Sequence, residues 1–208
     1  MEKYEIWSWK QQDEYENDLE AIYSLNTDDG FPNNYTEEVA KNTGLYGELT
    51  ESAVEHMLEI YNDYFTDPDG VFYDIGSGTG KVVCHVALGS SMHKVCGVEL
   101  DKIRFDKSIK LAESLNFPKA TPQFINDDFM IQDYSDATIM YFDNTMWNDY
   151  MIDDRRWLDK FFETIEPGTL IITKEPLPYV LGHLKMIELP TSYSWPTAYA
   201  LIYFGLKP

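Results

Sequence analysis

A glycine-rich turn followed at a distance by an acidic residue is the part of this sequence best suited to chemistry. The turn runs Asp74-Ile-Gly-Ser-Gly-Thr-Gly80, and Glu99 ends the next apolar run. Because glycine lacks a Cβ atom and adopts positive φ, such a turn lets the backbone approach a ligand, and the helix that follows offers unpaired N–H groups. A carboxylate at the tip of the second strand can accept hydrogen bonds from both hydroxyls of a ribose. Together these features predict a site for a nucleoside cofactor.

The spacing of the glycines separates the candidate cofactors. A dinucleotide site of the form G-x-G-x-x-G would need glycine where Lys81 stands. A Walker loop would need glycine at Ile75 and a hydroxyl residue at Val82. The order D-x-G-x-G-x-G with a later acid resembles motif I of class I S-adenosylmethionine (SAM) methyltransferases, whose cofactor carries no phosphate. Asp74 would then suit the cationic methionine end, and Glu99 the ribose.

Composition limits the class of protein. The chain has 208 residues, of which 44% are hydrophobic and 15% aromatic, which is enough for one folded domain with its own core. No run approaches the ~20 apolar residues of a membrane span, and the first residues lack the layout of a signal peptide. Cys84 and Cys96 lie in apolar runs, so we interpret both as reduced core residues of an intracellular protein. Neither they nor the four histidines have the spacing of metal ligands, and we expect no metal site.

The charge of the chain restricts its partners. A net charge of −20 repels DNA and anionic lipid and favours basic proteins. The longest basic run is the pair Arg155-Arg156. We therefore expect no direct DNA binding by this chain and no membrane contact. The acidic surface can equally well serve solubility alone, and composition does not separate the two readings.

The elements that must position these residues alternate along the chain. Helical periodicity is predicted over residues 11–25 and 48–64, with Thr50 as a cap of the second helix. From there, strands and helices alternate, which is typical of a parallel sheet with helices on both faces; the expected ranges are residues 71–74, 80–88, 94–99, 102–115, 122–125, 137–142, 154–164 and 169–173. Residues 185–189 and 198–204 read as two strands with no long helix between them, hence as an antiparallel hairpin.

These elements predict an α/β fold of the class I methyltransferase (Rossmann-like) type. We expect a seven-stranded, mostly parallel sheet that ends in the C-terminal hairpin. Residues 1–45 are expected to form an N-terminal helical segment and a loop that covers the cofactor site, and residues 46–208 the catalytic domain. Ligands of such sheets bind outside the carboxyl ends of the strands, where the acidic residues Asp74, Glu99, Asp128 and Asp143 all fall.

A closer resemblance extends from about residue 31 to the carboxyl terminus. Leu45-Tyr-Gly-Glu48 precedes a helix, and the glycine turn, Gly97-Val-Glu99 and Asp128-Phe129 follow in order. This order and spacing resemble the catalytic core of the Dot-one-like (disruptor of telomeric silencing) histone lysine methyltransferases. These are class I enzymes that methylate a lysine in the globular core of histone H3.

The resemblance implies a cofactor site for SAM, with S-adenosylhomocysteine as the product. Three residues would form a loop folded over SAM: Tyr46, Gly47 and Glu48. The turn residues would bind the cofactor around its methionine end: Asp74, Gly76, Ser77, Gly78, Gly80 and Lys81. Glu99 would hold the ribose, while Asp128 and Phe129 would flank the adenine.

The acceptor side departs from the family pattern. The family usually shows two asparagines after the fourth strand, followed by phenylalanines, whereas this chain reads Tyr141-Phe-Asp-Asn-Thr-Met-Trp147. Asn144 matches the second asparagine and Asp143 replaces the first, while Tyr141 and Trp147 stand at aromatic positions. Tyr199 follows Ser194-Trp195 and resembles the late aromatic signature of the family.

These five residues are the candidate catalytic set. An aromatic channel of Tyr141, Trp147 and Tyr199 would lower the pKa of a lysine ammonium by desolvation. Asp143 and Asn144 would accept hydrogen bonds from the amine. An ionised Asp143 also stabilises the ammonium, so it would either position the amine or relay its proton, and both roles stay open.

Three functions compete on these residues. The leading one is a SAM-dependent protein-lysine N-methyltransferase of a basic protein, by family resemblance a histone H3 core lysine. The alternatives are a methyltransferase of a non-histone protein or small-molecule amine, and an inactive SAM-binding interaction protein, which Asp143 would favour. The basic segments that nucleosome-acting relatives commonly add are missing here. We expect an intracellular monomer, nuclear if the histone reading holds and otherwise cytoplasmic.

Overall fold

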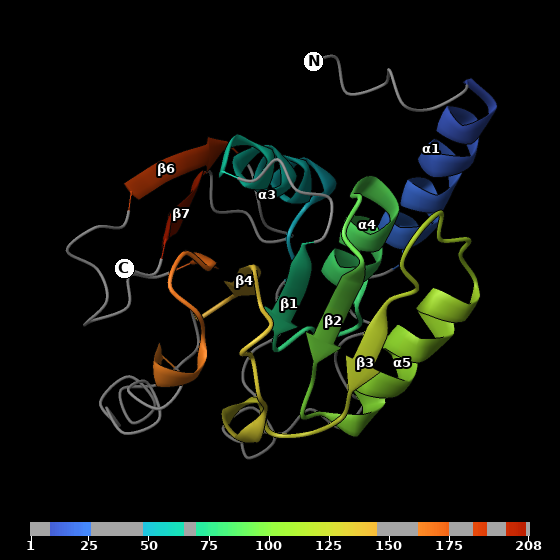
Figure 1. Ribbon diagram of the computed structural model, residues 1–208. Coiled ribbons are helices and arrows are strands. Elements are labelled where there is room, and N and C mark those ends of the chain that lie inside the picture. Colours follow the sequence, from blue (N-terminus) through green and yellow to red (C-terminus); the bar gives the residue numbers. More distant parts are fainter. Residues whose placement is uncertain are drawn as a thin grey trace.

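A computed structural model describes residues 9–25, 48–64, 70–144, 162–174, 185–190 and 199–206. Its centre is one seven-stranded sheet in the order β3-β2-β1-β4-β5-β7-β6 (Figure 1). The strands are β1 (Val71–Ile75), β2 (Lys94–Val98), β3 (Gln123–Ile125), β4 (Ile139–Phe142), β5 (Leu170–Thr173), β6 (Lys185–Pro190) and β7 (Tyr199–Leu206). The seven strands and their α/β alternation confirm the predicted fold class.

The direction of the strands also matches the prediction. β1 runs parallel to β2 and β4, β2 to β3, and β4 to β5. β7 is antiparallel to both β5 and β6, so the C-terminal hairpin is present. The hairpin enters the sheet through its second strand, because β7 lies between β5 and β6 and leaves β6 at the edge. The sequence pattern predicts the hairpin but not this order.

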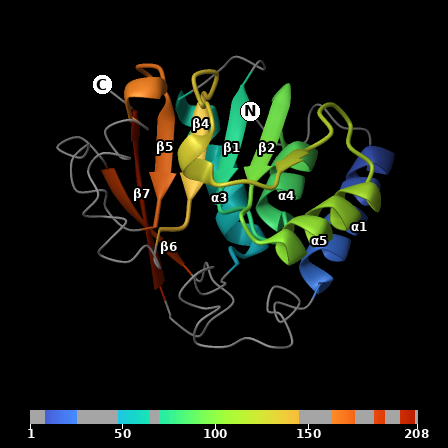
Figure 2. The same cartoon turned by 90° about the horizontal axis from the view of Figure 1, so that it is seen from below.

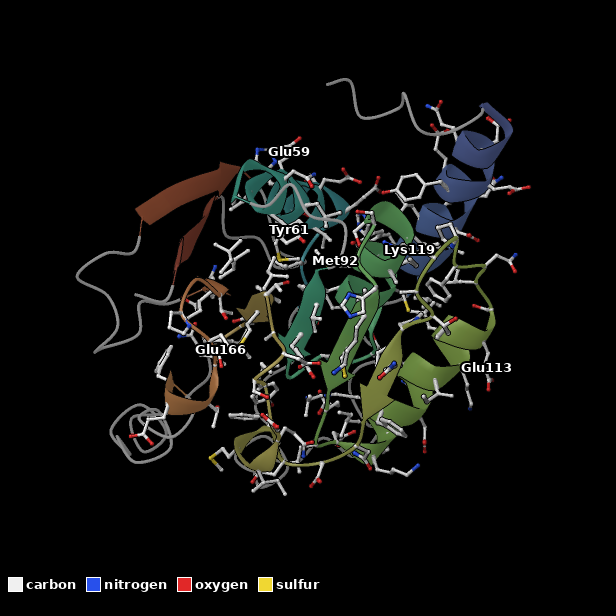
Figure 3. The ribbon with its side chains drawn as sticks, in the orientation of Figure 1. Glu59, Tyr61, Met92, Glu113, Lys119 and Glu166 are labelled. Carbon is white, nitrogen blue, oxygen red and sulfur yellow. The ribbon has the colours of Figure 1, made fainter. Side chains whose placement is uncertain are left out.

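The four long described helices gather on one face of the sheet (Figure 2). They are α1 (Trp9–Ser24), α3 (Glu51–Tyr64), α4 (Lys81–Gly89) and α5 (Lys102–Glu113). α3 and α4 cover the middle of the sheet, and α1 packs outside α4 and α5 through the buried side chains of Leu19 and Ile22. Tyr61 of α3 and Met92, which precedes β2, belong to the same buried cluster (Figure 3).

The opposite face is covered by other segments in the described part of the chain. The 3-10 helix η2 (Phe129–Ile131), Tyr134, Ala137 and Ile165 pack there. Residues 162–164 form the described end of the helix that the sequence predicts over 154–164; the rest of that helix lies outside the described residues. The prediction of helices on both faces is therefore supported on the second face by this short helix end, and otherwise stays a prediction there.

Alternation along the strands divides the core into two layers. Phe72, Ile139 and Tyr141 face α3 and α4, whereas Tyr73 and Met140 face the other side. Every residue of β1, β4 and β5 is buried, as expected for parallel strands covered on both faces. Polar side chains therefore become available mainly where the strands end, at their carboxyl edge.

Two smaller expectations are also met. Cys84 and Cys96 are buried free thiols. Thr50 directly precedes α3, and its carbonyl oxygen accepts from the N–H groups of Ala53 and Val54.

None of the described helices is long and apolar enough to cross a bilayer.

Candidate cofactor and acceptor site

The glycine turn is fixed to the neighbouring strand by main-chain hydrogen bonds. Gly76, Gly78 and Gly80 have φ values of 80°, 56° and 83°, a region that non-glycine residues rarely adopt. The N–H groups of Gly76 and Ser77 both donate to the carbonyl oxygen of Val98 in β2, at 2.8 and 3.0 Å. The turn is thus held by β2 rather than by its own side chains.

The two outer glycines serve different purposes. A Cβ atom on Gly80 would lie 2.6 Å from the Cβ of Ser108 and 2.8 Å from the ring of Phe124, so glycine is needed there for packing as well as for φ. A Cβ atom on Gly76 would meet nothing within 4 Å. The Gly76 side of the turn therefore offers bare backbone next to open space, as a cofactor site requires.

Ser77 points beneath the turn. A Cβ atom on Gly97 of β2 would lie 2.6 Å from the Oγ of Ser77, so this hydroxyl occupies the space that the missing side chain leaves. The Ser77 side chain is buried. Of the predicted cofactor residues, Ser77 thus contributes its side chain to the packing beneath the turn, and its N–H group to the hydrogen bond with Val98.

Glu99 follows β2 and closes the site opposite the turn. One carboxylate oxygen accepts from the N–H of Gly78 at 2.8 Å, and the other from the N–H of Asp101 at 2.7 Å. Asn126 donates its side-chain amide to the carbonyl oxygen of Glu99 at 2.8 Å. Burial raises the pKa of Glu99, while the Asp101 and Gly78 N–H groups and the Arg104 charge act against that rise. Each oxygen keeps a lone pair with which to accept from a ribose hydroxyl.

Asp74, in β1, brings a second carboxylate to the same place. Its side chain is buried, and burial, followed by the charges of Glu99 and Asp143, raises its pKa well above the ordinary value of 3.8. Three carboxylates thus act on one another at the ends of β1, β2 and β4. A cation placed among them would be stabilised, which fits the ammonium and sulfonium of SAM.

Lys81 and Glu48 are brought together. The Lys81 Nζ lies 2.7 Å from Glu48 Oε2 and 2.8 Å from the carbonyl oxygen of Leu25. The other oxygen of Glu48 accepts from the Thr79 hydroxyl at 3.2 Å. The predicted neighbours of Glu48, Tyr46 and Gly47, lie outside the described residues.

Asp128 and Phe129 lie after β3, on the far side of Glu99 from the turn. Asp128 caps η2, since its carboxylate accepts from the N–H of Met130 at 2.9 Å. Phe129 packs its ring against the core cluster of the second face. Its carbonyl oxygen accepts from the Tyr134 hydroxyl at 2.8 Å. Both residues are partly exposed at the edge where adenine is expected.

Sequence reasoning missed three residues of this edge. Leu100 comes directly after Glu99 and is 57% exposed, and Ile131 of η2 is 64% exposed. Leu100 thus offers an apolar side chain directly after Glu99, at the edge where adenine is expected. The signal was present in the sequence as an apolar residue directly after the acid. Asn126, which fixes the Glu99 backbone, carried no comparable signal.

The acceptor side begins at the end of β4. In the β1–β4 register, Asp74 pairs with Tyr141 and Ile75 with Phe142, so Asp143 follows beside Gly76. Asp143 is half-buried, and Asn144 is 1% exposed. Both predicted acceptor residues therefore follow β4 next to the start of the turn, and their role towards an acceptor stays a prediction.

Of the three predicted aromatic residues, the structure describes the side chain of one. Tyr141 is buried in the cluster between the sheet and the helices α3 and α4, beside Asp74. Trp147 lies outside the described residues. Tyr199 begins β7 opposite Pro190, and its side chain lies outside the described part. An aromatic channel around the acceptor stays a prediction.

No group of three or more possible metal ligands occurs within the described ranges. What these residues do provide is bare backbone at Gly76, a carboxylate acceptor at Glu99, an exposed apolar side chain at Leu100 and a negative field around Asp74. Each of the four fits one part of SAM. Fold and site together define a class I SAM-dependent methyltransferase.

Comparison with known proteins makes the assignment specific. A family model described as "Histone methylation protein DOT1" matches residues 32–186, which is more than half of the chain. The chain belongs to this family, and the resemblance seen in the sequence is confirmed.

Individual relatives are distant. The chain is 24% identical over 144 residues to a Caenorhabditis elegans protein named "Histone-lysine N-methyltransferase, H3 lysine-79 specific", covering 64% of this chain but 15% of that protein. It is 26% identical over 131 residues to a "Protein-lysine N-methyltransferase" of Saccharolobus islandicus (strain REY15A), covering 62% of this chain and 75% of that one.

Among solved structures, the fold is similar to an RNA methyltransferase from Salinibacter ruber in complex with S-adenosylhomocysteine. The TM-score is 0.60 and the identity 22%, with 76% of this chain and 92% of that chain covered. At this identity the likeness concerns the fold.

Proposed function

We propose that this protein transfers a methyl group from SAM to the side-chain amine of a lysine in a basic protein, with a histone as the leading acceptor. The observation that carries the proposal is the position of Asp143 and Asn144. They follow β4 directly, just beyond the pair that Phe142 makes with Ile75, and so come next to the start of a turn whose other features fit SAM. Membership of the DOT1 family supports lysine as the acceptor.

SAM, when bound, supplies a methyl group already activated on a sulfonium. The chain therefore has to deliver an amine in line with that group and exclude water, and it needs no covalent intermediate. Asp143 attracts the acceptor as an ammonium, because this half-buried carboxylate and Glu99 both act on the buried Asp74 and together make the field there negative. Asn144 is neutral and buried, so it orients the amine through its amide without opposing the loss of the proton.

The charge of the molecule supports a basic acceptor. At −20 the whole chain attracts cationic proteins at long range and repels nucleic acid. The acceptors that fit are a free histone, another basic protein, or a nucleosome held through histone basic patches. If the acceptor is a histone, the protein acts in the nucleus. If it is another basic protein, the expected location is the cytoplasm.

The experiment is transfer of tritium from labelled SAM. Core histones, other basic proteins and a pool of small metabolites are offered separately to the wild-type protein and to Asn144→Ala. The proposal expects label on lysine of a basic protein, reduced in the variant. Label only on small molecules, or SAM binding with no transfer to any acceptor, would overturn it.

A further inference from the structure

Lys81 makes its contacts away from the sheet. It is the first residue of α4 and follows Gly80 directly, yet its ammonium lies 2.7 Å from Glu48 Oε2 and 2.8 Å from the Leu25 carbonyl oxygen. Leu25 follows the last residue of α1, and Glu48 comes shortly before α3. One side chain thus joins three elements that are distant in the sequence.

The surroundings of this ammonium explain why it stays there. The Lys81 side chain is 6% exposed, and a buried charge is tolerated only where it is paired and hydrogen-bonded. Glu48 supplies the opposite charge. The carbonyl groups at the end of a helix have no main-chain partners within it and carry the negative end of its dipole, so the end of α1 also favours a cation.

Glu48 is held to the glycine turn twice. Its Oε1 accepts from the hydroxyl of Thr79, the residue between Gly78 and Gly80, and its Oε2 accepts from Lys81. The Glu48 side chain is itself 10% exposed. The carboxylate therefore lies against the last part of the turn, and Lys81 is the stronger of its two partners, because a charged hydrogen bond exceeds a neutral one.

We propose that Lys81 is a positioning residue for the cofactor site and does not itself bind the cofactor. It holds Glu48 against the turn and fastens the end of α1 to α4, so that cofactor affinity depends on Lys81 through Glu48. The proposal rests on the proposed function, and it assigns a role to α1, which precedes the region that the DOT1 family model matches.

A second contact one helical turn further along α4 supports this reading. His85 is fully buried, with Nδ1 at 2.8 Å from the Tyr23 hydroxyl and Nε2 at 3.0 Å from Glu55 Oε1. Positions four apart lie on one face of a helix. Lys81 and His85 therefore give α4 one polar face, which binds both α1 and α3. Tyr23→Phe removes a contact of α1 without touching the turn, which makes it a matched control.

The test is a double-variant cycle on the full chain, with the dissociation constant for SAM measured by calorimetry. Lys81→Met and Glu48→Gln are each expected to raise that constant about tenfold, since either change breaks a buried charge pair. The double variant Lys81→Met/Glu48→Gln should then bind SAM as tightly as Glu48→Gln alone. The KM for SAM should rise in the same variants while the KM for the acceptor protein stays constant, and Lys81→Arg should restore part of the affinity.

The outcomes separate the possibilities. A further tenfold loss when Lys81→Met is added to Glu48→Gln would mean that Lys81 binds the cofactor directly, and the proposal would be overturned. Unchanged affinity in Lys81→Met would overturn it too. If Lys81→Met alone does not fold, the comparison of Glu48→Gln with the double variant still decides, because Lys81 keeps the Leu25 carbonyl oxygen as a partner in Glu48→Gln and the double variant leaves neither charge buried. Tyr23→Phe should lower the melting temperature without changing SAM affinity. A wild-type protein that transfers no methyl group would count against the proposed function, not against this cycle of binding measurements.

Discussion

The cofactor half of the site is shaped mainly by backbone groups, and the acceptor half by side chains. At the ends of β1 and β2, main-chain N–H groups fix the geometry: those of Gly76 and Ser77 donate to the Val98 carbonyl oxygen, and those of Gly78 and Asp101 to the Glu99 carboxylate. At the end of β4, the described residues offer two side chains, Asp143 and Asn144. The geometry of the first half is fixed by its backbone, whereas the second half can change its acceptor by changing side chains.

This difference has a physical reason. SAM is the same molecule for every enzyme of the class, so a backbone cradle with fixed φ angles suits it. Acceptors differ, and side chains after a buried strand can be replaced without disturbing the sheet. Asp143 in place of the family's usual asparagine is one such replacement. We therefore expect substitutions in the turn to act on folding and SAM affinity, and substitutions after β4 to act on transfer.

The largest effect should come from the packing beneath the turn. Gly80→Ala combines a positive φ, which costs about 1–2 kcal/mol for an alanine, with contacts of 2.6 Å to Ser108 and 2.8 Å to Phe124, which cost roughly 1–3 kcal/mol more. Gly76→Ala has the same φ and an open environment, so only the first cost applies. Urea unfolding should show the larger loss in Gly80→Ala. Equal losses would mean that the close packing under the turn relaxes freely.

Glu99→Ala should give the next largest effect. It removes the ribose acceptor and leaves the N–H groups of Gly78 and Asp101 without their acceptor, so SAM affinity should fall by ~1.5–3 kcal/mol. Calorimetry with SAM measures the loss. Glu113→Ala, an exposed acid at the far end of α5 (Figure 3), is the matched control and should bind as the wild type does. Unchanged affinity in Glu99→Ala would refute its role at the ribose.

The backbone half of the site was easier to predict from the sequence than the side chains with distant partners. The turn and Glu99 are local patterns: glycines at fixed spacing after a short apolar run, then an acid at the end of the next run. Their geometry follows from φ preferences and from the parallel pairing of β1 with β2. The strand types and the hairpin followed from the same kind of local signal. The insertion of β7 between β5 and β6 did not, because strand order is set by packing across the whole sheet.

The parts that were missed depend on distant contacts. Lys81 finds its partners 33 and 56 residues away, in Glu48 and Leu25, and no spacing rule links these positions. Tyr141 shares with Ile139 the side of β4 that packs against α3 and α4. Because both faces of β4 are buried, the alternation of the strand did not indicate which of its residues approach the acceptor, and the role of Tyr141 stays a prediction. The division into residues 1–45 and 46–208 stays a prediction.

On the acceptor side, Asn144→Ala should slow methyl transfer about tenfold, or ~1.4 kcal/mol, by removing the amide that orients the amine. SAM affinity should change little, because Asn144 lies beyond the cofactor half. Single-turnover rates and calorimetry on the same preparation separate the two effects. A normal rate would remove Asn144 from the acceptor site.

Asp143→Asn restores the residue usual in the family and keeps the shape of the side chain. If Asp143 attracts the ammonium, the KM for the acceptor rises while the rate at saturation is kept. If Asp143 relays the proton, the saturated rate falls instead. Steady-state kinetics on one basic acceptor therefore assigns the role that the sequence left open.

The pH dependence of stability tests the negative field that joins the two halves. Burial, Glu99 and Asp143 raise the pKa of Asp74 above its ordinary value of 3.8. At pH values between the ordinary pKa and the raised pKa of the folded state, the folded protein keeps a proton on Asp74 that the unfolded chain has lost. The free energy of unfolding therefore falls as pH rises from about 4 until the folded-state pKa is passed. Asp74→Asn lacks this decline. Urea midpoints should show the variant more stable than the wild type at neutral pH, with the gap closing towards pH 4; parallel curves would mean that Asp74 is not held in such a field.

The smallest effect concerns the acceptor protein before it reaches the site. With a net charge of −20, the protein should capture basic peptides through long-range attraction, which salt weakens as the screening length shrinks from about 10 Å at 0.1 M to about 3 Å at 1 M. The kcat/KM for a lysine flanked by basic residues should fall several-fold over this range. The same lysine in a neutral peptide is the control and should respond little. If both peptides give a flat response, the acidic surface serves solubility, and recognition of the acceptor lies entirely in the short-range contacts after β4.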